Sequence, residues 1–146
     1  MADALTDKTF QFELVSPERI LASIDARMVI VPGEDGDFGV LADHAPLLSS
    51  MRPGVVTVTS AEGDVQRIFV SGGFADVTGT QCSVLAEEAI SVSDLDRDAL
   101  SADLKNLEDD LEFAKEDAVK RAHVQREMDV TRAKLAALSE VVKHAA

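Results

Sequence analysis

Apolar and polar residues alternate along several short runs in the first part of the chain. Alternation with a period of two places apolar side chains on one face of an extended backbone, so each run predicts a half-buried β-strand. Turns containing Pro or Gly separate the runs at intervals of about ten residues, which is typical of a β-sandwich or barrel. The predicted strands are residues 10–15, 28–31, 55–59, 65–70 and 81–85, and the expected core includes Phe10, Phe12, Phe69 and Phe74.

After residue 93 the hydrophobic period becomes helical. Ser93 is predicted to cap the first helix, and Asp96 resembles the second half of a capping box. Apolar positions then recur at alternating spacings of four and three residues, in two stripes. The first stripe comprises Leu100, Leu104, Leu107, Leu111, Ala114 and Ala118, and the second comprises Val124, Met128, Thr131, Leu135, Leu138 and Val142.

The two stripes are out of phase, because continuing the first would reach Arg121 and Gln125. We therefore predict a break between Phe113 and Val124, with an antiparallel helical hairpin as the result. No Gly or Pro marks that break. A single long helix with a three-residue stammer is therefore the alternative.

Glycine and proline indicate where the two parts meet. All eight Gly and all four Pro lie at or before Gly79, and none follows it. The predicted fold class is therefore α+β. We expect a β-sandwich domain at residues 1–92 and a helical hairpin domain at residues 93–146.

Composition excludes several classes of protein. Of the 146 residues, 46% are hydrophobic, so a core can form. The net charge of −13 would repel phosphate backbones and anionic lipids, which argues against nucleic-acid binding and direct membrane binding. We expect no signal peptide and no membrane span, since no apolar run approaches about 18 residues, so a protein facing the cytosol is the default. The single cysteine, Cys82, excludes an internal disulfide and is expected to be buried.

Charge is distributed unevenly along the helical part. Residues 94–118 carry 10 acidic and 3 basic side chains, whereas residues 119–146 carry 3 acidic and 6 basic ones. Attraction between the two helices is one interpretation, although exposed ion pairs contribute only about 0 to 1 kcal/mol each. Such pairs would hold a hairpin closed while leaving it able to open.

The run from Pro32 to Leu48 is the most unusual segment of the chain. It contains glycines at three-residue spacing (Gly33, Gly36 and Gly39) and a histidine, His44. Glycine and proline set the backbone path directly, so the run predicts a shaped surface. It contains no nucleophile–base pair, which favours a docking surface over a reaction centre.

Searches for specific chemistry in this run fail. No Gly-Lys pair exists for a phosphate loop, and the glycines lack the Gly-x-Gly start of a dinucleotide site. A calcium loop counted from Asp35 would need Glu at its twelfth position, where Pro46 stands. His44 has no orienting acid nearby and is expected to bond the backbone of its own turn. We therefore predict no catalytic residue, no metal site and no cofactor.

These residues resemble the epsilon subunit of F-type ATP synthases. The resemblance covers residues 8–143 and rests on a central run followed in order by three shorter matches and the helical tail. The matching segments are Pro32-Gly33-x-x-Gly36-x-Phe38-Gly39-Val40-Leu41-x-x-His44-Ala45-Pro46-Leu47, then Pro53-Gly54, Ser71-Gly72-Gly73-Phe74-x-x-Val77 and Ala86-Glu87-x-Ala89.

The resemblance implies a fold and a role. The fold is a flattened sandwich of two five-stranded sheets followed by two helices. The role is that of a non-catalytic rotor subunit whose sandwich binds the gamma subunit and sits on the c-ring. Ion-driven rotation of the ring, by protons or sodium, is thereby coupled to ATP synthesis at the cytoplasmic face of a bacterial membrane. Carried over by position, the expected ring contacts are Asp37, Phe38, His44, Ala45 and Pro46.

The resemblance also implies regulation by the tail. In the family, basic residues of the second helix contact acidic segments of the alpha/beta catalytic head and restrain ATP hydrolysis. The corresponding residues here are Arg126, Arg132, Lys134 and Lys143. Some members bind ATP through Leu/Ile-Asp-x-x-Arg-Ala, but Ala99 stands here where that arginine is expected, so no ATP site is predicted.

A second hypothesis comes from a different class of protein. A stand-alone acidic adaptor would use its helical hairpin to recruit a partner and would not associate with membranes. An enzyme is a weaker third reading, because the sequence offers no adjacent titratable pair.

Overall fold

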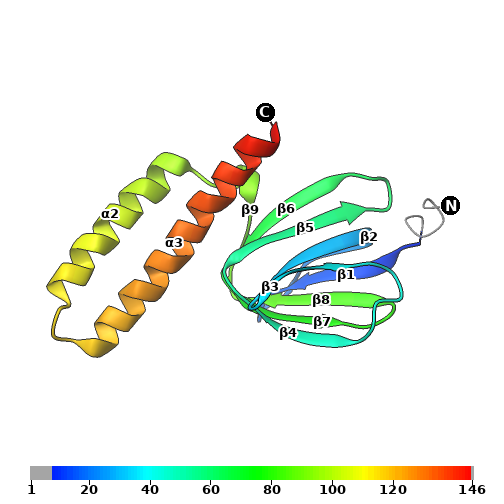
Figure 1. The fold of residues 1–146 in the computed structure, drawn as a ribbon, viewed down its shortest axis with the longest axis horizontal. Coiled ribbons are helices and arrows are strands. Elements are labelled where there is room, and N and C mark those ends of the chain that lie inside the picture. Colours follow the sequence, from blue (N-terminus) through cyan, green and yellow to red (C-terminus); the bar gives the residue numbers. More distant parts are fainter. Residues whose placement is uncertain (1–7, 146) are drawn as a thin grey trace. The chain divides into compact units, whose positions relative to one another are not determined.

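One long strand, β2 (Ile20–Gly33), organises the β-rich part of the structure, a computed structural model that describes residues 8–145 and their side chains through residue 140. The chain divides into two compact units, Met1–Ser91 and Val92–Ala146. Figure 1 shows the strands of the first unit and the helices of the second. The other strands are β1 (Phe10–Val15), β3 (Gly36–Val40), β4 (Leu47–Met51), β5 (Gly54–Ser60), β6 (Val65–Val70), β7 (Gly73–Val77), β8 (Gln81–Ala86) and β9 (Ala89–Ser91).

Strand β2 belongs to both layers of a sandwich. Its first part pairs with β1, which continues through β8 and β7 to β4. After a register shift between Ala26 and Met28, its second part pairs with β3 on one edge and β5 on the other, and β5 leads to β6 and β9. Each layer therefore has five strand segments, which confirms the expected sandwich (Figure 1).

The core lies between the two layers and is built mainly from Val and Phe. Alternate residues of β1 and β8 point inward, as the period of two predicts. Phe10, Phe12 and Phe69 are buried as predicted, but the expectation for Phe74 is wrong. Phe74 is 53% exposed, because its neighbour Ala75 takes the inward position on β7.

A glycine is required where β7 begins. Gly73 has a φ of 133°, in a region that L side chains rarely adopt. A Cβ placed there would lie 2.0 Å from the carbonyl oxygen of Leu85 on the neighbouring strand. The close approach of β7 to β8 at this end therefore depends on glycine.

The first helix of the second unit begins three residues later than predicted. Residues Val92–Asp94 form a 3-10 turn, and α2 spans Arg97–Phe113. Its N-cap is Asp96, whose carboxylate accepts hydrogen bonds from the amides of Asp98 at 3.0 Å and Ala99 at 3.2 Å. The prediction of Ser93 as N-cap was wrong, because the intervening turn moves the first free amides to those following Asp96.

The predicted break between the helices is confirmed. α3 spans Ala118–Ala145, so the break falls at residues 114–117. The alternative of a single long helix is therefore wrong. Asp117 takes the place of a glycine or proline signal. Its carboxylate accepts from the amide of Lys120 at 3.1 Å, and its carbonyl accepts from the amide of Arg121 at 2.9 Å.

The two predicted stripes form most of the seam of this hairpin, but Ala118 is exposed, and Ala137, which belongs to neither stripe, is buried. Leu100, Ala114 and Met128 are buried. Thr131 is buried in the same seam, and its hydroxyl donates to the carbonyl of Glu127 at 2.9 Å. That bond satisfies a polar group that would otherwise be costly to bury. Val142 lies outside the residues whose side chains are described.

Candidate functional site

The run from Pro32 to Leu48 folds as a hairpin, a loop and the first residues of β4. Gly33 pairs with Gly36, which leaves Glu34 and Asp35 as an exposed two-residue loop. Gly36 has a φ of 140°, a conformation that glycine adopts without strain. The amide of Glu34 donates to the carbonyl of Ser50 at 2.9 Å, which ties the hairpin to β4.

Two residues of the hairpin fit together closely. A Cβ on Gly33 would lie 3.0 Å from the ring of Phe38 and 2.6 Å from the carbonyl oxygen of Gly36. The half-buried ring of Phe38 therefore packs over a position that only glycine can occupy. Phe38 is part of the hairpin's own packing.

Arg52 holds the base of this hairpin. Its guanidinium donates to the carbonyl of Gly33 and to Oδ1 of Asp37, each at 2.5 Å. Its backbone amide donates to the carbonyl of Pro32 at 3.1 Å. The side chain of Asp37 is 60% exposed in this ion pair. The sequence analysis did not identify Arg52 as a functional residue. The run Arg52-Pro53-Gly54 indicates only a turn of the chain.

The second predicted contact lies in the loop between β3 and β4. Asp43 adopts a positive φ of 66°, and its amide donates to the carbonyl of Gly79 at 2.9 Å. Its carboxylate accepts from Nζ of Lys8 at 3.1 Å. His44 Nδ1 lies 2.6 Å from the carbonyl oxygen of Ala45, which agrees with the expected bond within its own turn.

The structure does not bring the two groups of predicted ring contacts together. Arg52 and Asp37 lie where β4 ends, whereas His44, Ala45 and Pro46 precede its first residue. The two groups lie beyond opposite ends of β4, whose five residues span about 13 Å at a rise of roughly 3.3 Å per residue. A small contact with a partner can therefore include Asp37 or the His44–Pro46 segment, but not both.

An apolar row crosses the outer face of the layer formed by β2, β1, β8, β7 and β4. Direct pairing joins Val15 to Leu85 and Leu85 to Phe74, and Ile20 pairs with Val15 across a register shift between Leu14 and Val15. Leu48 lies two residues from Ser50, the partner of Phe74, and is therefore its diagonal neighbour. Leu48 is 71% exposed. We name these five side chains the apolar row: Ile20, Val15, Leu85, Phe74 and Leu48.

Carboxylates flank the apolar row on the same face. Glu13 and Asp76 both pair with Ser83, one step along the strands from the row. No ion pair involves either carboxylate among the side chains described for residues 8–140. The face therefore presents an uncharged strip beside negative charge.

The predicted inhibitory residues do not form one patch. Arg126 and Arg132 are exposed on α3 but lie about 120° apart around the helix, at roughly 100° per residue. Lys134 is half-buried and engaged in a contact. Lys143 lies outside the residues whose side chains are described.

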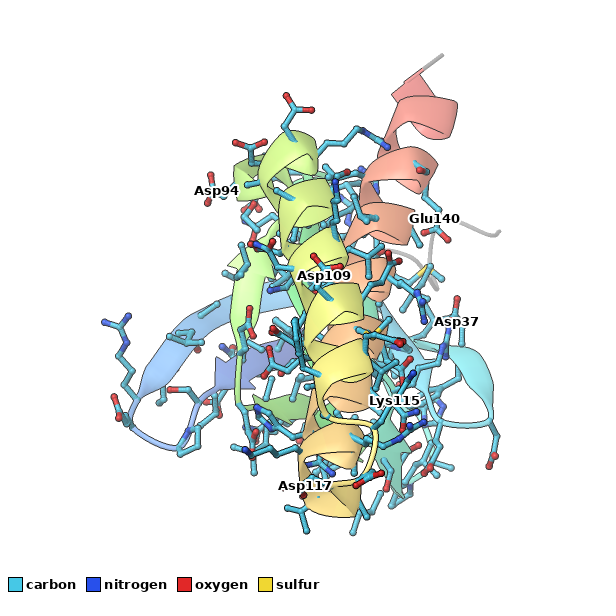
Figure 2. The ribbon with its side chains drawn as sticks, turned by 90° about the vertical axis from the view of Figure 1, so that its left-hand side faces the viewer. Asp37, Asp94, Asp109, Lys115, Asp117 and Glu140 are labelled. Carbon is cyan, nitrogen blue, oxygen red and sulfur yellow. The ribbon has the colours of Figure 1, made fainter. Side chains whose placement is uncertain are left out.

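The turn between the helices carries a shallow apolar groove. Phe113 and Val119 line it and are highly exposed, together with the cationic Lys120 and Arg126. Figure 2 shows Lys115 and Asp117 at this end of the hairpin and Asp109 pointing outward from α2. The sequence analysis named Phe113 only as one limit of the predicted break and did not predict this groove.

The structure supplies little chemistry beyond binding. Among the described residues, no three His, Cys, Asp or Glu side chains gather as a metal site would require. Neither described helix combines the length and the apolar composition needed to cross a bilayer. Cys82 is fully buried. Burial is the larger cause and the nearby carboxylate of Asp76 the smaller cause that raise the pKa of its thiol from 9.0 to about 11.

Together these features define a class of protein. A sandwich with an exposed apolar row and a clamped, glycine-shaped hairpin, joined to a helical hairpin, is a docking protein. Its shaped surfaces have no catalytic constellation among the described side chains.

Comparison with known proteins identifies the family. Residues 9–92 match the model of the beta-sandwich domain of the ATP synthase delta/epsilon chain. The chain is 48% identical over 118 residues to the ATP synthase epsilon chain of Rhodospirillum rubrum, covering 81% of this chain and 88% of that one. It is 47% identical over 143 residues to the epsilon chain of Rhodospirillum centenum, covering 92% of each.

Solved structures agree on the fold. A chain in the structure of Euglena gracilis mitochondrial ATP synthase, OSCP/F1/c-ring, superposes with a TM-score of 0.79 at 20% identity, covering 89% of this chain and 81% of that chain. The protein belongs to the family of ATP synthase epsilon chains. It is therefore a non-catalytic subunit of that complex, which sets aside both the adaptor and the enzyme hypotheses.

Cys82 should be nearly inert toward thiol reagents in the folded protein. At pH 8 a thiol of pKa about 11 has roughly a hundredfold less thiolate than one of pKa 9.0, the value expected after unfolding. Modification by iodoacetamide, followed by mass spectrometry, should be at least that much slower in buffer than in denaturant. Equal rates would show that Cys82 is accessible.

Proposed function

We propose that this epsilon chain is a rotor subunit of the central stalk, bound to gamma and seated on the c-ring. Its task is to couple ion-driven rotation of the ring to ATP synthesis in the alpha/beta head. It would lie at the cytoplasmic face of a bacterial membrane and associate with that membrane only through the complex. The bacterial origin of the epsilon chains described above supports this location.

The observation that carries the proposal is the apolar row. Leu48 on β4 and Phe74 on β7 are large apolar side chains, and both face solvent in the isolated chain. A contiguous exposed apolar strip costs solubility unless a partner covers it. We assign the apolar row to gamma, and expect gamma to present an apolar ridge with Lys or Arg beside it, opposite Glu13 and Asp76.

We assign the ring contact to the β2–β3 hairpin. This end offers the exposed carboxylate of Asp37 on a backbone fixed by glycine and by Arg52. The loop at the other end uses its polar groups internally, in the bonds of Asp43 and His44. The His44–Pro46 part of the expected ring contact is therefore the weaker candidate.

Regulation by the helical hairpin is the second part of the proposal. Arg126 and Arg132 are exposed cations on the net-positive second helix. The short polar turn at residues 114–117 joins the helices without glycine or proline, so the seam between them decides whether the hairpin stays closed. We propose that an open hairpin brings these arginines to acidic segments of the catalytic head.

Phe74→Ser should weaken binding of the full-length chain to gamma by roughly tenfold or more, since a central aromatic is a typical hot spot. Leu48→Ser should act in the same direction. Phe113→Ser is the matched control, because it removes an even more exposed aromatic from the helical unit. Titration calorimetry with purified gamma measures these affinities, and equal losses for Phe74→Ser and Phe113→Ser would refute the assignment.

A cysteine at Asp37 should crosslink to the polar loop of the c-ring in assembled membranes, in a chain whose Cys82 is replaced by Ala. A cysteine at Ala45 should not, because it lies at the opposite end of β4. Mass spectrometry of the crosslinked peptides identifies the partner. Crosslinking from Ala45→Cys alone would move the ring contact to the His44 loop.

The double variant Arg126→Ala with Arg132→Ala should raise the rate of ATP hydrolysis by the reconstituted complex severalfold, because it removes the cations proposed to restrain the head. Lys105→Ala, an exposed cation on the acidic helix, is the control. A coupled ATPase assay measures the rates. Unchanged hydrolysis in the double variant would exclude this form of regulation.

A further inference from the structure

We propose that Arg52 is a positioning residue that presents one oxygen of Asp37 to a hydrogen-bond donor on the c-ring. The inference rests on the proposed ring contact and adds to it a residue and a mode of action. It begins from the way in which a single guanidinium engages two different acceptors of the hairpin.

Two hydrogen bonds fix the orientation of the Arg52 guanidinium. One terminal nitrogen donates to the carbonyl of Gly33 and the other donates to Oδ1 of Asp37. The donors of arginine form a rigid planar fork, so fixing one nitrogen on the backbone also fixes the other. The carboxylate of Asp37 is thereby held by a group whose own orientation is set by β2.

The backbone around Arg52 is equally constrained. Its amide donates to the carbonyl of Pro32, and a Cβ on Gly54, two residues further along, would lie 2.8 Å from Cβ of Pro32. The turn that carries Arg52 is therefore packed directly on the end of β2. Both ends of the arginine, backbone and guanidinium, are anchored on the same two residues, Pro32 and Gly33.

Asp37 is left with unused bonding capacity. Arg52 engages Oδ1, and Oδ2 has no donor among the residues that the structure describes. An ionised carboxylate accepts on both oxygens, and this one is 60% exposed. The fitting partner is a donor that approaches from solvent, such as an arginine, a lysine, a side-chain amide or a backbone N–H of the ring loop.

Arg52 therefore acts through Asp37 and not as a contact of its own. An unclamped aspartate would pay the entropy of ordering its side chain when the ring binds, whereas a clamped one has already lost that freedom. The exposed ion pair itself adds little stability to the fold. Its contribution is expected in docking.

A double-mutant cycle tests this. Full-length variants are rebound to membranes that carry ATP synthase stripped of this subunit, and affinities are measured. Asp37→Ala should weaken rebinding by roughly three- to tenfold, the value of one exposed charge-assisted hydrogen bond. Arg52→Ala should weaken it by a similar factor, and the double variant should be no weaker than Asp37→Ala alone.

Controls separate positioning from charge and from folding. Arg52→Lys retains the cation but not the fork, so it should bind like Arg52→Ala; full affinity in Arg52→Lys would overturn the proposal. Arg19→Ala removes an exposed arginine elsewhere on the sandwich and should leave affinity unchanged. Thermal unfolding of each variant confirms an intact fold.

The outcomes also separate this inference from the proposed function. Additive losses in the double variant, or an unaffected Asp37→Ala, would overturn the role of Arg52 while leaving the rotor assignment intact. Failure of the wild-type chain to rebind at all would instead contradict the proposed function.

Discussion

The pairing of β2 with both layers is the constraint on which the rest of the sandwich depends. The strand hydrogen-bonds to β1 along its first part and to β3 and β5 along its second, and the register shift near Arg27 marks the transfer. Because side chains alternate with a period of two, a slip by one residue would turn Ala26, Val29 and Val31 out of the core. The same register places Gly33 beside Met51, and so brings Arg52 to the hairpin.

The structure confirms the five strands that the sequence predicts. The sequence analysis misses β4, in which Leu47 and Leu48 are both exposed, and it also misses the first part of β2, although residues 22–27 alternate between apolar and polar. Phe74 shows the limit most clearly. Its residue type favours the core, but its position on β7 is set by Ala75, and only pairing with β8 reveals which face is outward.

The candidate site was predictable to a similar degree. Glycine and proline spacing identifies the Pro32–Leu48 run, since these residues shape the backbone wherever they stand. The clamp on Asp37 could not be found in this way, because Arg52 lies 15 residues away and reaches it through strand register. The apolar row is harder still. Its five members come from five different strands, so no window of the sequence contains the pattern.

The two proposed contacts differ in physical character, and that difference suggests how they divide the work. Burying a large apolar side chain contributes roughly 1.5 to 3 kcal/mol, whereas an exposed charged contact contributes about 0 to 1 kcal/mol. In this proposal the apolar row, whose most exposed members are Leu48 and Ile20, supplies affinity for gamma. In the same proposal the carboxylate of Asp37 supplies direction, because Arg52 fixes its geometry in advance. A subunit that transmits rotation needs both, since tight attachment alone would not define its orientation on the ring.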